Sequence, residues 1–275
     1  MEILVGKEKT SMKYLPWLLL FLVALTGPAS SAQKIITFGE PDGTGHPYVG
    51  GLVVEVQGQK QLICSGTLIS PNVFLTAAHC TQWLTSTNVT NAWVTFDGAF
   101  TSSSKLYPGT MYTNPAYDWR QNDPGDLAVV VLKSPPAPLP PAVYLPTAGM
   151  LDQIAAKNGL KGQVFTALGY GASELTIGGG KPSFTYPDIR KVALSTFAAL
   201  NPAWIRLSQN PSTGDSGVCY GDSGGPIFLG AVPPEAPTIV AITVTGDAMC
   251  RATNVVYRLD TPSARAFLIG FVTLP

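Results

Sequence analysis

The sequence has little charge and few histidines, and both shortages narrow the classes of function that fit it. Only 12% of its 275 residues are charged, and 17 basic residues balance 17 acidic ones to a formal net charge of zero. No basic cluster stands out, so nucleic acid is not an expected partner. Hydrophobic residues make up 45% of the chain, which is enough for a sizeable core and argues against disorder.

Metal-binding patterns are missing as well. The chain has four cysteines and two histidines, and none of the cysteine spacings is C-x-x-C, so we expect no metal site. In an exported protein the cysteines would form disulfides, and spacing alone leaves three pairings open. The four are Cys64, Cys80, Cys219 and Cys250.

The N-terminus lacks an apolar run long enough to cross a membrane comfortably. Three lysines, ending at Lys13, precede an apolar segment of eleven residues, 15–25, and small residues follow up to Ala32. A membrane-spanning helix needs about 20 apolar residues. The pattern therefore predicts a signal peptide over 1–32, with Met12 as an alternative start, and no stable membrane anchor. We expect a secreted extracellular protein, or a periplasmic one if the source is bacterial.

Long helical periods are missing from most of the chain. Short β-branched runs separated by Gly, Pro, Asn or Asp predict strands and favour an all-β barrel or sandwich. A proline-rich stretch, 134–141, cannot be a central strand and predicts a connector between two β halves. The predicted strands are 51–56, 62–69, 73–77, 92–96, 127–132, 164–168, 192–197, 227–229, 239–244 and 255–259.

The C-terminus is the exception to this strand pattern. Thr261 as N-cap and Pro262 in the first turn predict a helix. Apolar residues between Phe267 and Val272 would dock it on the β structure.

Glycine gathers around one serine, in the sequence Gly221-Asp222-Ser223-Gly224-Gly225-Pro226. Such a cluster is typical of a turn. It also fits a nucleophile loop, in which glycines let backbone N–H groups approach a substrate oxygen. A serine nucleophile needs a base, because its hydroxyl is protonated near neutral pH, and a carboxylate that orients that base.

The chain offers one good candidate for each of these two roles. His79 ends an apolar run beside a cysteine and is the candidate base, whereas His46 in a Gly-His-Pro turn is interpreted as structural. Asp126 heads an apolar strand, where a partly buried carboxylate requires a partner. Asp123 is interpreted as a solvated turn residue.

Three motifs, in this order, resemble those of the chymotrypsin/trypsin-like serine protease family: TAAHC around His79, GDLAVVVL around Asp126 and GDSGGP around Ser223. The likeness extends from about Ile35 to the C-terminus. It implies an all-β fold of two antiparallel six-stranded β-barrels, and a serine endopeptidase that hydrolyses peptide bonds through an acyl-enzyme. His79, Asp126 and Ser223 would be base, orienter and nucleophile, and the N–H groups of Gly221 and Ser223 would form the oxyanion hole.

The resemblance also implies the disulfides and the partners. Cys64 would pair with Cys80 and Cys219 with Cys250, which leaves the family's third common disulfide absent. No metal or organic cofactor is needed for the chemistry. The expected partners are a protein or peptide substrate and a proteinaceous inhibitor, and we expect a monomer.

The expected start of the mature chain departs from the family pattern. Family zymogens are activated by a cut that frees an Ile-Val-Gly-Gly start, whose ammonium pairs with the aspartate before the serine. Here Ile35 follows Lys34 and lies twelve residues before Pro47, as in the family, but the two glycines are missing. The resemblance implies a propeptide of 33–34, a mature domain of 35–275, and an ion pair between Ile35 and Asp222.

The resemblance finally implies a pocket for the residue before the scissile bond. Gly217, six residues before the nucleophile, would be its uncharged floor, and Val218 an apolar wall. Val255 would shorten it, and Thr245 or Gly246 would line the opposite wall. We predict cleavage after small or medium apolar residues, with lysine and arginine rejected for want of a counter-charge.

Two other classes of function remain open. A catalytically silent relative would keep the fold as a binding module, but all three triad candidates are present. A serine esterase would carry Gly-x-Ser-x-Gly with histidine last in the chain, whereas His79 comes first. Separately, Asn88-Val89-Thr90 predicts a glycosylation site if the source is eukaryotic.

Overall fold

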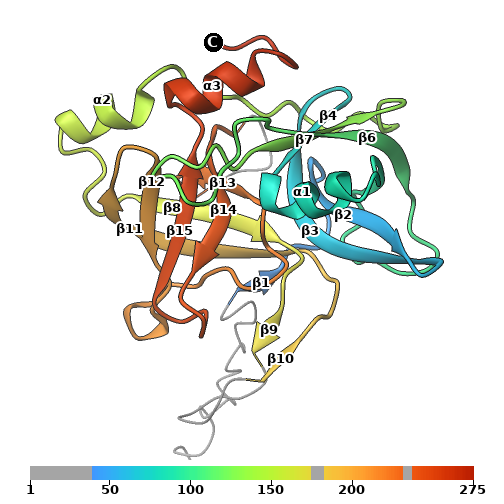
Figure 1. Cartoon of the computed structure of the whole chain (residues 1–275). Coiled ribbons are helices and arrows are strands. Elements are labelled where there is room, and N and C mark those ends of the chain that lie inside the picture. The colour runs from blue at the N-terminus through green and yellow to red at the C-terminus, as the bar shows by residue number, and fades with distance from the viewer. Residues whose placement is uncertain (1–38, 175–182, 232–236) are drawn as a thin grey trace, which may run out of the picture. The chain divides into compact units, whose positions relative to one another are not determined.

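The computed structural model describes residues 39–174, 183–231 and 237–275, and Figure 1 shows the arrangement of their helices and strands. The predicted signal peptide, the predicted propeptide and Ile35 lie outside the described residues.

Six antiparallel strands close a first barrel. Its interior is lined by apolar side chains such as Leu52, Phe74 and Val130, which are fully buried. β7 is buried along nearly its whole length, which explains why its sequence is almost continuously apolar. Around the barrel the strands are β2 (Val49–Val56), β3 (Gln59–Ser70), β4 (Val73–Thr76), β7 (Ala128–Leu132), β6 (Tyr107–Thr113) and β5 (Asn91–Thr95).

Six further strands form a second barrel, which closes where β11 pairs with β8. Its core contains Phe165, Ile205, Leu207, Val240 and Val256. The two closed antiparallel barrels confirm the predicted fold. The strands are β8 (Val164–Gly169), β11 (Lys191–Leu200), β12 (Trp204–Ser208), β15 (Thr253–Arg258), β14 (Ile239–Gly246) and β13 (Pro226–Leu229). Short β1 (Glu40–Pro41) adds to β11, and β9 (Ser173–Glu174) pairs with β10 (Phe184–Thr185).

Helices occupy little of the described chain. The predicted C-terminal helix is present as α3 (Pro262–Leu268), where the Thr261 hydroxyl accepts the Ala264 N–H at 3.3 Å. α1 (Ala78–Ser86), α2 (Met150–Ala156) and the 3-10 turn η1 (Pro211–Thr213) are additions to the predicted elements. Among the described residues, no helix combines the length and the apolar character that a membrane crossing requires.

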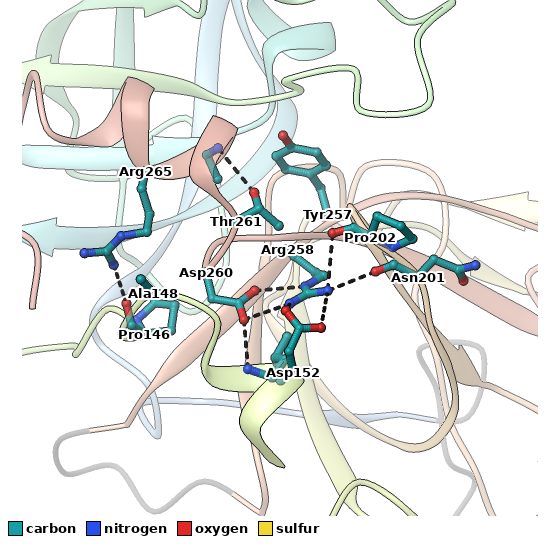
Figure 2. A network of polar contacts seen from close by, with 12 residues as sticks. Pro146, Ala148, Asp152, Asn201, Pro202, Tyr257, Arg258, Asp260, Thr261 and Arg265 are labelled. Atoms are coloured by element: carbon teal, nitrogen blue, oxygen red, sulfur yellow. Dashed lines mark hydrogen bonds and ion pairs between the residues drawn. The ribbon is translucent and has the colours of Figure 1, made fainter. Parts of the chain in front are cut away.

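A buried arginine fastens α2 to the second barrel (Figure 2). Arg258 is 2% exposed, and its guanidinium donates to both carboxylate oxygens of Asp260 at 2.9 Å. It also donates to Asp152 of α2 at 2.7 Å and to the Asn201 carbonyl oxygen at 3.0 Å. One of these two Asp260 oxygens also accepts the Leu151 N–H at 2.8 Å. A buried charge with this many partners holds the segment after the connector in one place.

Candidate active site

His79 and Asp126 are brought together by the pairing of β4 with β7 in the first barrel. His79 lies in the first turn of α1, directly after β4, and Asp126 lies two residues before β7. The two carboxylate oxygens of Asp126 take separate partners: one accepts the backbone N–H of His79 at 2.9 Å, and the other lies 2.8 Å from His79 Nδ1. Asp126 is 2% exposed, whereas the imidazole is half-buried. An ionised carboxylate only accepts hydrogen bonds, so it holds the proton on Nδ1 and leaves Nε2 free to act as a base.

Ser223 lies in the loop that precedes β13 of the second barrel, and this loop, the Ser223 loop, reaches across to the first barrel. The Ser223 carbonyl oxygen accepts the Ser65 N–H at 2.8 Å and lies 3.9 Å from the Sγ atom of Cys80, the residue after His79. A Cβ atom on Gly224 would lie 2.7 Å from the backbone nitrogen of Ala77. With a φ of 78°, this position requires glycine. The close approach places the Ser223 loop against the first turn of α1.

Some backbone N–H groups in the Ser223 loop are paired and two are free. Those of Asp222, Gly224 and Gly225 each donate to a backbone carbonyl at 2.8 to 3.1 Å. Within the described chain, the N–H groups of Gly221 and Ser223 have no acceptor. Gly221 adopts a φ of 97°, a left-handed conformation that favours glycine. Two free donors two residues apart are suited to an anionic oxygen.

The carboxylate of Asp222 points away from this pair of donors, into the protein. It is fully buried and accepts the N–H groups of Gly171 at 2.7 Å and Cys219 at 2.8 Å. Burial raises the pKa of Asp222 to about 6, and the two backbone donors and the charge of Lys191 oppose that rise. Because Ile35 lies outside the described residues, its pairing with Asp222 stays a prediction.

Both disulfides that the resemblance implies are formed. Cys64–Cys80 joins β3 to α1, and its sulfur atoms lie within 4.8 Å of a ring nitrogen of His79. Because these sulfurs are bonded to each other, the cluster presents no thiolate to a metal ion. Cys219–Cys250 joins the Ser223 loop to the segment after β14.

A pocket of about 220 Å³ opens beside Ser223, and only part of its predicted lining is correct. Val218, Thr245 and Gly246 line it. Val255 does not: it lies in a different hollow, against Trp204 and Arg206. The remaining lining is Cys219, Tyr220, Thr243, Val244, Asp247, Ala248 and Cys250.

The prediction for Gly217 also needs correction, because this residue is not part of the lining of that pocket. A Cβ atom at Gly217 would lie 2.0 Å from the Oε1 atom of Gln209, whose side chain fills that space. Gln209 is 1% exposed and accepts the Val218 N–H at 3.0 Å. The predicted floor is therefore covered by the amide side chain of the residue that follows β12.

Asp247 is a charged residue of the pocket that was not predicted from the sequence. Its carboxylate accepts the backbone N–H groups of Ala252 and Thr253 at 2.8 Å and of Arg251 at 3.1 Å, and the Gln209 amide at 3.2 Å. Burial raises the pKa of Asp247, but these donors outweigh it and hold the pKa below its ordinary value. An aspartate between glycine and alanine is typical of a turn, so no sequence signal distinguishes it.

Three other residues singled out by the sequence lie away from this pocket. His46 is buried, with Nδ1 2.5 Å from the Asp42 carboxylate, as a structural histidine would be. Asn88 is exposed just beyond α1, and its glycosylation stays a prediction. Asp123 is exposed, but it is more than a solvated turn residue, because it accepts the hydroxyl groups of Tyr257 and Ser263 at 2.5 Å.

A histidine–aspartate pair on one barrel and a glycine-flanked serine loop of the other, packed at the N-terminal end of the helix that carries the histidine, are the components that serine-based acyl transfer requires. The family model described as Trypsin matches residues 36–267, and the chain belongs to the trypsin family. A stretch of 63 residues is 44% identical to mast cell protease 3 of Ovis aries and, separately, to duodenase-1 of Bos taurus. Each of these alignments covers 23% of this chain and 25% of the relative.

Proposed function

We propose that the protein is a serine endopeptidase that acts through His79, Asp126 and Ser223. His79 Nε2 takes the proton of Ser223 Oγ as that oxygen attacks the substrate carbonyl carbon, and the imidazolium then protonates the departing amine. Water attacks the resulting acyl-enzyme by the same route, with His79 again as base. Asp126 orients the ring and stabilises the imidazolium.

The observation that carries this proposal is the pair of free N–H groups at Gly221 and Ser223. Donors placed where negative charge develops stabilise the tetrahedral intermediate, and each is worth about 3 kcal/mol. A silent binding module has no need of two unpaired donors in addition to an oriented histidine. Membership of the trypsin family also disfavours an esterase.

We propose that the enzyme cleaves after small or medium apolar residues. Val218, Val244, Ala248 and the Cys219–Cys250 disulfide give the pocket an apolar lining. The Asp247 carboxylate is already occupied by three backbone N–H groups and by Gln209, so it is a poor partner for a substrate cation. The leader pattern and the two disulfides support a secreted enzyme.

Labelling with a fluorophosphonate, which reacts only with an activated serine, tests the catalytic assignment. The chain should be labelled and should hydrolyse peptides. Ser223→Ala should lose both properties and keep its melting temperature, because the change removes one oxygen atom from a half-buried side chain.

Ser212→Ala is the matched control, since Ser212 is an exposed serine of the same barrel. It should label and turn over like the unchanged chain. Substantial turnover by Ser223→Ala would overturn the assignment.

A further inference from the structure

The Asp222 carboxylate rests on the segment that follows β8. A Cβ atom at Gly169 would lie 2.1 Å from one of its oxygens, and a Cβ atom at Gly171 would lie 2.4 Å from the other. Both positions therefore require glycine, and the Gly171 N–H donates to the carboxylate at 2.7 Å. Asp222 is held against backbone that a side chain would displace.

Lys191 approaches the same segment from β11. In the β8–β11 register it lies directly opposite Gly169. The residue is 4% exposed, and its ammonium donates to the hydroxyl of Ser173, two residues beyond Gly171. A lysine and an aspartate, both buried, therefore converge on five consecutive residues, 169–173.

The two charges need each other. An isolated ammonium or carboxylate in the interior is costly, and opposite charges in a medium of low polarity attract over more than contact distance. Within the described chain they do not touch within 4 Å, but Lys191 is the cation whose charge acts on Asp222. Burial lowers the pKa of Lys191, and the charge of Asp222 opposes that change.

Asp222 in turn fixes the donors at the active site. Its carboxylate accepts the Cys219 N–H at 2.8 Å, and its backbone N–H donates to the Cys219 carbonyl at 3.1 Å. These bonds define the turn on which Gly221 presents its free N–H. A carboxylate that left this position would release the turn and with it the paired donors of Gly221 and Ser223.

We propose that Lys191 is a positioning residue that supplies the internal counter-charge of Asp222, so that the Ser223 loop is held ready for catalysis while the Lys34–Ile35 bond is intact. This inference rests on the proposed function. Lys191 would then take the place of a freed Ile35 ammonium as the positive charge near Asp222. The enzyme would then work without the activating cut.

Lys34→Gln tests this directly, because it removes the basic residue at which the cut would occur. Intact mass and N-terminal sequencing verify that Ile35 is not freed. We expect this chain to react with a fluorophosphonate and to turn over a peptide substrate as fast as the unchanged chain. If it is inert, and if the chain cleaved after Lys34 is active, the freed ammonium is required and the proposal is wrong.

Lys191→Met in the Lys34→Gln background removes the charge and keeps an apolar side chain of similar length. We expect the labelling rate and kcat/KM to fall about 10²- to 10³-fold, the size of losing an oxyanion donor. The acid limb of the pH–rate profile should also move to higher pH, because Asp222 without its cation is harder to ionise. A purely structural role for Lys191 would not move that limb.

Lys161→Met, at an exposed lysine just before β8, is the control and should change neither rate nor profile. Equal activity of the Lys191→Met and Lys161→Met chains would overturn the proposal. Should Lys191→Met fail to fold, the Lys34→Gln chain still tests the proposal, because its inactivity beside an active cleaved chain would overturn it. If no form is labelled, cleaved or uncleaved, the proposed function fails instead.

Discussion

The first barrel and its loops bury one carboxylate, that of Asp126, whereas the second barrel and the segments packed on it bury lysine, arginine and several aspartates. The strands of the first barrel otherwise bury serine and threonine, such as Ser65 and Thr76. The second region buries Arg190, Lys191, Asp215, Asp222, Arg258 and Asp260. The first barrel is held by apolar packing and carries the oriented His79 ring. In the second, the buried Asp222 carboxylate holds the Ser223 loop, so we expect the two barrels to respond differently to loss of a charge.

The largest expected effect of such a loss is on stability, at Arg258. Arg258→Met would leave Asp260 fully buried without its main partner and would release Asp152 of α2. Removing one member of a buried ion pair costs about 3–5 kcal/mol of unfolding free energy. Urea unfolding measures this, in the Ser223→Ala background so that self-cleavage does not interfere.

Arg206→Met is the matched control, because Arg206 is exposed on β12 of the same barrel. This change should lower the unfolding free energy by less than about 1 kcal/mol, as surface changes usually do. Equal losses at the two arginines would contradict the view that the Arg258 network holds this barrel together.

The next effect is a pH dependence at Asp222. Folding raises the pKa of this aspartate from 3.8 to about 6, so the native state holds the proton more tightly than the unfolded chain does. The favourable contribution of Asp222 to the unfolding free energy is therefore largest at low pH. It falls by about 3 kcal/mol in total as the pH rises from about 4 to about 6.

Asp222→Asn, again with Ser223→Ala, removes this titration. The unfolding free energy of the Ser223→Ala chain, which keeps Asp222, should fall between pH 4 and pH 7 relative to that of the double variant. The comparison cancels the other carboxyl groups, which are the same in both chains. A difference between the two chains that stays constant with pH would contradict the raised pKa.

What the sequence predicts well is local, and what it misses depends on partners far along the chain. The three motifs and the apolar runs are each contained in a few residues. By contrast, Arg190 is 148 residues from its partner Asp42. Lys191 comes near the segment beside Asp222 only because β11 pairs with β8. No short window of sequence shows that either cation is buried.

The missed strands have equally specific causes. β6 contains Pro108 and Gly109, which normally argue against a strand. Gly109 is needed there because a Cβ atom would lie 2.6 Å from a methyl group of Val130. β12 does alternate, with Ile205 and Leu207 inward, but it is only five residues long.

Val255 shows how the two faces of a strand misdirect a prediction about a site. Aligning Val255 with a pocket glycine of the family places its side chain in the pocket. In the structure Val256 faces the core of the second barrel and Val255 faces the opposite side of β15. Because neighbouring residues of a strand point to opposite faces, the pairing of β15 with β12 and β14 decides which face Val255 occupies, and a short motif does not show that pairing.

The smallest expected effect concerns Asp247, the charge in the pocket that was not predicted from the sequence. Four donors already occupy its carboxylate, so we expect it to support the turn up to Thr253 and not to bind a substrate cation. Profiling with peptides that vary only at the residue before the scissile bond should favour Ala, Val or Leu over Arg and Lys by about 10- to 200-fold. Asp247→Asn should leave that order unchanged, because the apolar lining sets it. If the unchanged enzyme instead prefers Arg or Lys, and if Asp247→Asn abolishes that preference, then Asp247 is the specificity charge and the apolar prediction is wrong.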